Sequence, residues 1–440
     1  MNTEPLHQIV NGFTGACKGL RLYPPRHPSI QRQIEKLLQL LQAHLGSRAQ
    51  FKIGLLEETL FIDDQLFAIQ TPATEVLTAL LQRLQIEMLE FHQGLEAQEL
   101  LAFLQILDGP VVLAEELKQV FERHRIRHIR LAESTSDEDR EPRKIYGRAM
   151  TVVNEIFQDV RLGRIPSSEK ARHVVKDMAR LTLAEPHALF ALSMLKSYDN
   201  YTFTHSVNVS VIALAVGRAC GLSETELLCI GLGGLLHDIG KLKIDLNIIN
   251  KPGRLSEQEF SQIMHHPRLG ANMVRESEGV SATVVDIVLG HHLRYDLQGY
   301  PADARLQGPM KPVHMTAIAD CYDAITTLRA YQQPITPRQA IAKMLETSGS
   351  ILHPDYLNAF MTSLGNFPVG SMVRLANNEI GLVTRVGRDN TEEIELKILF
   401  SAQGDRLEQP PVRQLGSNDG HLLVAEVDSF IKGVNPVDFF

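Results

Sequence analysis

The sequence of 440 residues contains no tryptophan, and aromatic residues make up only 6% of it. Hydrophobic residues nevertheless reach 44%, so the hydrophobic cores must consist mainly of leucine, isoleucine and valine. The four cysteines are scattered without a C-x-x-C spacing, and Cys220, Cys229 and Cys321 stand within apolar runs. This pattern argues against a zinc ribbon or a disulfide framework and predicts reduced thiols in the protein core.

Long apolar runs are also missing. No uninterrupted apolar stretch approaches the roughly 20 residues that a membrane-spanning helix needs, and the first ten residues lack the basic and apolar regions of a signal peptide. We therefore expect a cytoplasmic protein. The net charge of −8 argues against a long nucleic acid as partner, because proteins usually neutralise its phosphates with a basic face. A small anionic ligand, held by a few basic residues and metal ions, is compatible with this charge.

The length accommodates two or three domains, and residues 1–132 are predicted to form a small α/β unit. The apolar pattern predicts a helix over 30–45, a hairpin over 51–62, a helix over about 73–84, a strand over about 86–91 and a helix over about 96–107. Ser29 is the candidate N-cap of the first of these helices. Because this region carries no chemically distinctive cluster, we expect a sensory, docking or dimerisation domain.

The composition changes twice after this unit. Residues 133–144 are polar and charged, which predicts a linker. Residues 145–366 are predicted to be almost entirely helical, with N-caps at Ser223 and Ser256, each followed three residues later by a glutamate. Residues 367–440 are predicted to form a small, β-barrel-like all-β domain, with strands over 372–375, 380–386 and 393–400.

The helical region carries a high density of side chains that can bind metal: His205, His237, Asp238, His265, His266, His291, His292 and Asp320. Imidazole and carboxylate together suit divalent transition metals such as Fe, Mn or Zn better than Ca or Mg. A single helical histidine is more often an ordinary core or surface residue than a ligand. The His-Asp pair, however, directly follows the apolar stretch Leu227–Leu236, where buried polar groups need a partner. Metal ions are the partner that serves several such groups at once.

A series of short segments between Tyr198 and Gly365 extends this prediction. The segments are YTFTHSVNV at 201–209, HDIGK at 237–241, KPG at 251–253, HP at 266–267, HH at 291–292, GYP at 299–301 and IADCYDA at 318–324. In this order and spacing they resemble the HD-GYP family of bacterial phosphodiesterases. The resemblance implies an all-α HD-type catalytic domain that hydrolyses a cyclic dinucleotide in second-messenger signalling. Its expected substrate is cyclic di-GMP and its expected product linear pGpG, with GMP formed by further hydrolysis.

The resemblance also implies a metal cluster ligated by His205, His237, Asp238, His266, His291, His292 and Asp320. Asp238 would bridge two divalent ions, for which Fe or Mn is expected. His265 is expected to be a neighbour, because the family's ligand directly precedes the proline. Family members with a third ion use a glutamate at the position of Tyr201, so we expect two ions here.

Asp238 and Lys241 are the implied catalytic residues, and Lys241, Arg294 and Arg329 are implied to contact the substrate. The sequence departs from the family pattern where Leu293 replaces a glutamate, Leu297 a glycine, Gln332 a basic residue, His314 an arginine and His353 an aspartate. The loss of glycine at position 297 is expected to reshape the loop, since other residues tolerate positive φ poorly.

These departures leave more than one function open. The chain could hydrolyse cyclic di-GMP, prefer a mixed cyclic GMP-AMP dinucleotide, or act as an HD phosphohydrolase on another nucleotide. It could also be a weakly active or inactive signalling adaptor that binds partner proteins through the Gly299-Tyr300-Pro301 loop or the N-terminal unit. A helix over 146–160 could pair two chains into a homodimer. The retained ligand set favours an enzyme, because buried histidine and aspartate without a metal are costly to keep.

Overall fold

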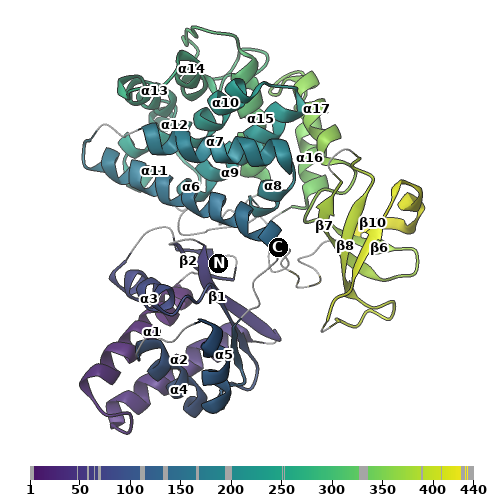
Figure 1. Cartoon of the computed structure of the whole chain (residues 1–440). Helices are drawn as coiled ribbons and strands as arrows, with labels where there is room; N and C mark the ends of the chain where they lie inside the picture. The colour runs from purple at the N-terminus through teal and green to yellow at the C-terminus, as the bar shows by residue number, and fades with distance from the viewer. Residues whose placement is uncertain are drawn as a thin grey trace. The chain divides into compact units, whose positions relative to one another are not determined.

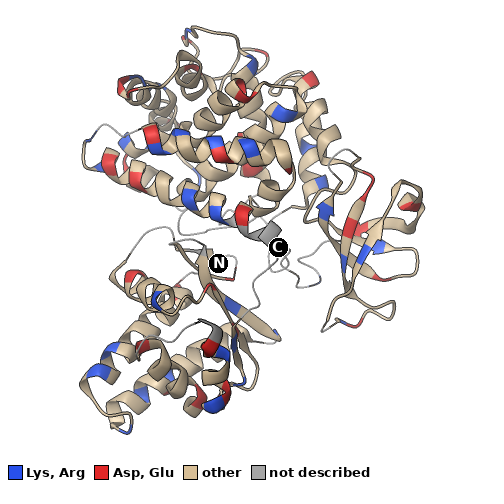
Figure 2. Cartoon of the chain, in the orientation of Figure 1, with Lys and Arg blue, Asp and Glu red and all other residues tan. Residues whose placement is uncertain are grey.

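The computed structural model of the chain describes residues 4–46, 48–56, 59–63, 65–67, 71–109, 114–131, 137–164, 168–193, 201–249, 251, 253–326, 335–387, 390–407, 409–427, 432 and 434. These residues belong to two compact units, with the division between Gly147 and Arg148 (Figure 1). Within the described part of the chain, no helix combines the length and the apolar character needed to cross a lipid bilayer. Acidic and basic residues are interspersed over both units (Figure 2).

The first unit combines helices with one antiparallel sheet in the strand order β3-β2-β1-β4-β5. Its elements are α1 (Glu4–Leu22), α2 (Pro28–Leu45), β1 (Gln50–Leu56), β2 (Thr59–Ile62), β3 (Gln65–Leu66), α3 (Pro72–Arg83), β4 (Met88–His92), α4 (Ala97–Asp108), α5 (Ala114–Arg123) and β5 (Ile129–Leu131). The predicted hairpin is the β1–β2 pair, in which Ile53 faces Ile62. In the core, the rings of Phe51 and Phe91 stack with centroids 5.0 Å apart. The sequence missed α1, α5, β3 and β5.

The start of α2 differs from the prediction. The helix begins at Pro28, so Ser29 lies inside it, and His27 is the N-cap. The Ser29 backbone N–H donates to Nδ1 of His27 at 3.2 Å. Proline suits this first helical position because its missing N–H would have no partner there in any case. The prediction of Ser29 as N-cap was therefore wrong by two residues.

The second unit begins inside the long helix α6 (Asp137–Arg161). Residues 137–144, which we expected to belong to a linker, are helical in the structure, whereas 133–136 lie outside the described residues. Interspersed charges of both signs are also typical of a solvent-facing helix, so composition alone did not separate the two states. The predicted helix over 146–160 is part of α6.

Helices make up most of the second unit, as predicted for an HD-type domain. They are α7 (Ser168–Ala184), α8 (Ala188–Leu192), α9 (Tyr201–Ala219), α10 (Glu224–Leu236), η1 (Ile239–Lys243), α11 (Leu246–Ile249), α12 (Glu257–Ile263), α13 (His266–Glu276), α14 (Ala282–Gly290), α15 (Lys311–Thr326), α16 (Pro337–Glu346) and α17 (Pro354–Leu364). The caps predicted at Ser223 and Ser256 are both capping boxes. The helices α9, α10 and α15 pack together at the centre, and Ser210 of α9 donates to the carbonyl oxygen of Gly231 on α10 at 2.7 Å.

The chain ends in a second antiparallel sheet with the order β10-β6-β7-β8-β9. Its strands are β6 (Met372–Leu375), β7 (Ile380–Val386), β8 (Ile394–Phe400), β9 (Val412–Leu415) and β10 (Leu423–Val427), with η2 (Ser417–Leu422) before the last. The three predicted strands are confirmed. Among the described residues β9 and β10 are the two edge strands and do not pair with each other, so barrel-like closure is not seen there. Ala191 of α8 is part of this sheet's hydrophobic core, and the sheet belongs to the same compact unit as the helices.

Candidate metal centre

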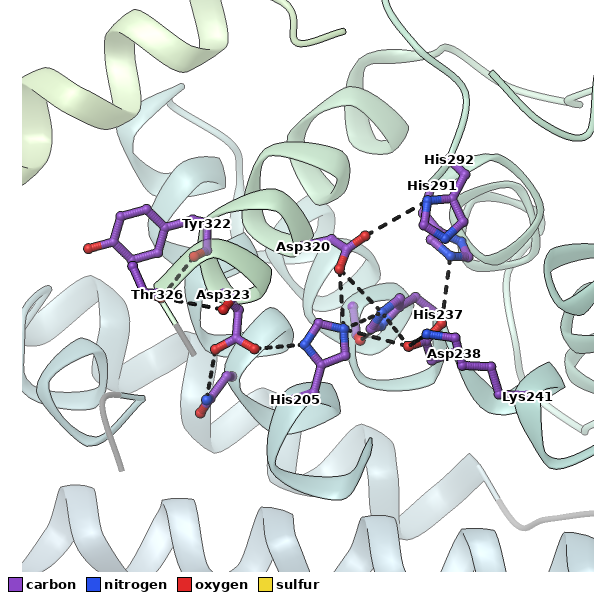
Figure 3. Close-up of polar contacts among 12 residues, drawn as sticks. His205, His237, Asp238, Lys241, His291, His292, Asp320, Tyr322, Asp323 and Thr326 are labelled. Atoms are coloured by element: carbon purple, nitrogen blue, oxygen red, sulfur yellow. Dashed lines mark hydrogen bonds and ion pairs between the residues drawn. The ribbon is translucent and has the colours of Figure 1, made fainter. Parts of the chain in front are cut away.

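All seven ligands predicted from the sequence converge in the helical unit, although they come from separate elements. Figure 3 labels all of them except His266. They are His205 on α9, His237 and Asp238 after α10, His266 at the start of α13, His291 and His292 after α14, and Asp320 on α15. The side chains of His292 and Asp320 keep 26% and 16% of their surface exposed, and the other five are buried. His265, the neighbour of His266, is exposed. The cluster is therefore closed on most sides and open near His292 and Asp320.

A glycine allows the two halves of the cluster to approach each other. The 3-10 helix η1 follows Asp238 and packs against α13. A Cβ atom at Gly240 would lie 2.0 Å from the carbonyl oxygen of His266 and 2.5 Å from the backbone nitrogen of Gly270. Both are backbone atoms that cannot rotate away, so only glycine fits this contact. The contact places His266 beside Asp238.

Backbone carbonyls set the tautomer of three histidines. In His237, His266 and His291, Nδ1 lies 2.7, 2.8 and 2.9 Å from the carbonyl oxygen three residues earlier. A carbonyl oxygen can only accept, so Nδ1 carries the ring proton in each case. The lone pair of each Nε2 is then free, and these three nitrogens point into the cluster. This is the arrangement in which imidazole binds metal ions.

A carboxylate performs the same task for His205. Nδ1 of His205 donates to Oδ2 of Asp323 at 2.7 Å, and the amide of Asn208 donates to Oδ1 of Asp323 at 2.9 Å. All three residues are buried. Sequence reasoning did not assign Asp323 to the site, although it stands three residues after Asp320 and therefore on the same face of α15. That helical spacing is the signal that could have identified it.

The ligand atoms form two groups that share one carboxylate. In the first group, Nε2 of His205 lies 3.2 Å from Nε2 of His237, and Oδ2 of Asp238 lies 3.5 and 3.3 Å from these two nitrogens. In the second group, Nε2 of His266 lies 3.1 Å from Nε2 of His291 and 3.2 Å from Oδ1 of Asp238. Ligands that surround one divalent ion at about 2.1 Å are separated by roughly 3 to 3.5 Å. Each group therefore has the spacing of a metal site, with one oxygen of Asp238 in each.

Asp320 lies between the two groups (Figure 3). Its Oδ1 is 3.2 Å from Nε2 of His205, and its Oδ2 is 4.0 Å from Nδ1 of His292. Oδ1 also lies 4.0 Å from Nε2 of His237. The carboxylate can therefore bind on either side of the cluster from its more open edge.

Two features of the cluster fit a metal rather than a network of hydrogen bonds. The Nε2 atoms of His266 and His291 face each other at 3.1 Å, but both rings already use their proton at Nδ1. Oδ1 of Asp238 is buried and accepts no hydrogen bond. Buried acceptors without donors are costly, and a cation is the partner that relieves several at once.

The protonation states also suit a cation. Burial alone would raise the pKa of Asp238, but the positive charge of the neighbouring Lys241 opposes this effect, and the pKa lies well below its usual range. Asp320 behaves in the same way: burial opposes ionisation, but the imidazole rings that surround this carboxylate lower its pKa. Burial lowers the pKa of His292 to about 3. At neutral pH the site therefore presents carboxylates and a neutral imidazole, the forms that ligate metals.

The predicted substrate-contacting residues differ in how far the structure supports them. Nζ of Lys241 lies 2.6 Å from Oδ2 of Asp238 and one quarter of its side chain is exposed, so its charge lies at the edge of the cluster. Arg294 instead pairs with Asp296 at 2.7 Å. Arg329 lies outside the described residues.

The loop after His292 contains a non-glycine residue with a positive φ. Leu297, where the family has glycine, adopts a φ of +63° and is 64% exposed. The expectation that the loss of glycine reshapes this loop stays a prediction. Two of the other departures noted from the sequence are neighbours: the rings of His314 and His353 lie 5.5 Å apart.

Comparison with known proteins places the same region among HD domains. Residues 188–355 match the HD domain family, whose members bind divalent metals. A cyclic di-GMP phosphodiesterase of Pseudomonas aeruginosa is 36% identical over 267 residues, which are 61% of this chain and 64% of the relative. The chain therefore spans slightly less than two thirds of that relative.

A second relative has another substrate in its name. A 3′3′-cGAMP-specific phosphodiesterase of Vibrio cholerae is 31% identical over 169 residues, 38% of this chain and 32% of the relative. Among solved structures, an HDG"Y"P protein from Bdellovibrio bacteriovorus matches 56% of this chain and 80% of its own, with 18% identity and a TM-score of 0.44.

Proposed function

We propose that this chain, whose residues 188–355 match the HD domain family, is a metal-dependent phosphodiesterase. It would open a cyclic dinucleotide, with cyclic di-GMP as the first candidate substrate. The observation that carries the proposal is the pair of ligand groups joined by Asp238, because each carboxylate oxygen faces two imidazole nitrogens of its own group. Paired metal sites with one shared carboxylate are typical of phosphodiester hydrolysis. The similarity to a cyclic di-GMP phosphodiesterase supports the substrate class.

The proposed ligands are His205, His237, Asp238, His266, His291, His292 and Asp320. Nitrogen and oxygen donors in this ratio suit two ions of Fe or Mn. When bound, such ions supply Lewis acidity to the phosphoryl group and lower the pKa of the attacking water. Water then adds to phosphorus, the bond from phosphorus to the 3′-oxygen breaks, and the departing oxygen takes up a proton to give the linear dinucleotide.

The chain's own residues orient this reaction. Asp323 holds the ring of His205, and the backbone carbonyls hold the rings of His237, His266 and His291. Lys241 lies at the edge of the cluster, where its ammonium group can donate to a non-bridging phosphate oxygen as negative charge develops. Arg294 can contact the substrate once it leaves Asp296, and Arg329 is retained as a proposed contact from the family resemblance.

Cyclic GMP-AMP is the second candidate substrate. It is favoured by the similarity to a phosphodiesterase specific for that nucleotide. It is also compatible with the altered loop, in which Leu297 exposes an apolar side chain where the family has glycine. The adaptor function, signalling partners at the Gly299-Tyr300-Pro301 loop or the N-terminal unit, a homodimer and a cytoplasmic location remain predictions.

The first test is hydrolysis of cyclic di-GMP and cyclic GMP-AMP by the full chain, loaded anaerobically with Fe(II) or Mn(II) and analysed by chromatography. His266→Ala removes a buried ligand and should abolish turnover and lower metal content. His265→Ala removes the adjacent exposed histidine and should leave both unchanged. Equal behaviour of the two variants would contradict the proposed ligand set. Full metal loading without any linear product would overturn the proposed phosphodiesterase activity and favour the adaptor function.

A further inference from the structure

Phe260 is an exposed aromatic residue near the cluster. The short helix α12 buries none of its residues, yet it carries Phe260, which is 46% exposed. The helix is held in place at its start by the capping box of Ser256 and by Lys251, whose Nζ lies 2.6 Å from Oε2 of Glu259. A helix anchored by polar contacts does not need an apolar ring on its surface for stability.

A chain of ring contacts connects Phe260 to the cluster. The ring of Phe260 meets that of Tyr300 edge-on, with centroids 6.4 Å apart. Tyr300 in turn lies 4.5 Å from the ring of His292 and 6.3 Å from that of His266. Tyr300 is therefore the inner ring and Phe260 the outer one, and the two continue outward from the cluster's second ligand group.

We propose that Phe260 is a stacking surface for one nucleobase of the substrate, and thus a residue that determines affinity for cyclic dinucleotides. The inference rests on the proposed function. In a cyclic dinucleotide the phosphates belong to the central ring and the bases project from it. If one phosphate binds at the metal ions, a base therefore lies farther out than the ligand side chains and Tyr300. The exposed ring of Phe260 lies in that direction. Stacking on an aromatic ring suits any base, because every base has a π-face.

The alternative is that Phe260 only covers Tyr300. Both roles use its apolar area, but only stacking requires a flat ring. Phe260→Leu keeps an apolar side chain that can cover Tyr300, and Phe260→Trp enlarges the flat surface. The two substitutions therefore separate packing from stacking.

Steady-state kinetics of the metal-loaded chain give the first readout. Phe260→Ala and Phe260→Leu should raise KM for the cyclic dinucleotide roughly five- to 150-fold with little change in kcat, because the lost contact is the same in ground and transition states. Phe260→Trp should retain the affinity. The inhibition constant of inorganic phosphate, which has no base, should stay the same in all of these variants. Tyr23→Ala is the matched control, because Tyr23 is an aromatic residue of the first unit with the same exposed fraction of 46%.

A second readout does not depend on turnover. Since the chain contains no tryptophan, Phe260→Trp introduces a single fluorescent reporter at this position. Cyclic di-GMP or cyclic GMP-AMP should quench its fluorescence, whereas inorganic phosphate should not. Quenching without hydrolysis would support base stacking at position 260 and overturn the proposed phosphodiesterase activity. Hydrolysis with no quenching and an unchanged KM for Phe260→Ala would overturn the stacking surface alone. Neither quenching nor hydrolysis would overturn both.

Discussion

The histidines of the cluster are oriented by hydrogen bonds on the side of each ring that faces away from the proposed ions. Three of these bonds go to backbone carbonyls, which no side-chain substitution removes. The fourth goes from His205 to Asp323, and it is the one that mutation can test. Such outer partners fix the tautomer and the ring orientation of a ligand and so contribute to metal affinity.

Asp323→Asn should therefore weaken metal binding. An amide is a poorer acceptor than a carboxylate, and its NH₂ group can turn toward His205 and favour the wrong tautomer. We expect affinity for Mn(II) to fall about 10- to 100-fold, measured by equilibrium dialysis of the full chain. Asp177→Asn, at an exposed ion pair with Arg148, should leave the affinity unchanged. An unaltered affinity in Asp323→Asn would show that the carboxylate does not position His205.

At the scale of elements, the site depends on how closely η1 and α13 approach each other. Asp238 directly precedes η1, His266 is the first residue of α13, and Gly240 lies at the contact between the two elements. The loop after α14 shows the opposite case. There the backbone adopts a left-handed conformation that favours glycine, although Leu297 occupies the position. Backbone strain in a residue with positive φ, such as Leu297, costs roughly 1 to 2 kcal/mol, which a fold can tolerate. A Cβ atom at Gly240 would instead clash with backbone atoms, which cannot rotate away.

Gly240→Ala should separate η1 from α13. A Cβ atom 2.0 Å from the His266 carbonyl oxygen forces a backbone shift, so we expect a loss of about 3 kcal/mol or more in unfolding free energy and a lower metal content. Gly15→Ala is the control, because Gly15 lies in α1 with open space around it, and should be neutral or stabilising by up to about 1 kcal/mol. Urea denaturation and elemental analysis measure the two effects. Similar stabilities of the two variants would contradict this role of Gly240.

For the whole molecule, the two units differ in what their polar residues do. Within the described residues, the groups of side chains spaced for a metal ion all lie in the second unit. The polar contacts of the first unit hold its elements together: Asp63, for example, pairs with His44 of α2 and with Arg48 at 2.9 and 2.7 Å. The proposed catalytic site therefore lies in the second unit, and the sensory, docking or dimerisation role of the first unit stays a prediction.

The stability of the protein should depend on pH through His187. Burial, together with the positive charge of Arg218, lowers the pKa of His187 to about 4 from its ordinary value of 6.5. Between these values the unfolded chain binds a proton that the folded chain does not, so unfolding free energy should fall as pH falls from 6.5 to 4. His187→Gln should reduce this dependence in urea denaturation at several pH values, and His173→Gln, at an exposed position, should not. An identical pH dependence in wild type and His187→Gln would contradict the prediction.

Much of the fold followed from local patterns. The strands β6, β7 and β8 and the capping boxes at Ser223 and Ser256 were predicted because alternation and cap chemistry are properties of neighbouring residues. The short edge strands β3 and β5 were missed, since two or three residues carry no readable period. The start of α6 was missed because charged composition is shared by linkers and solvent-facing helices.

The sequence by itself indicated the proposed ligands, through the order and spacing of its short segments and their resemblance to the HD-GYP family. Only the tertiary structure decided that the two oxygens of Asp238 face different histidine groups, that Asp323 orients His205, and that Phe260 lies outward from Tyr300. These relations join residues far apart along the chain or depend on the direction of a side chain. They arise from the packing of helices against one another, which no local pattern encodes.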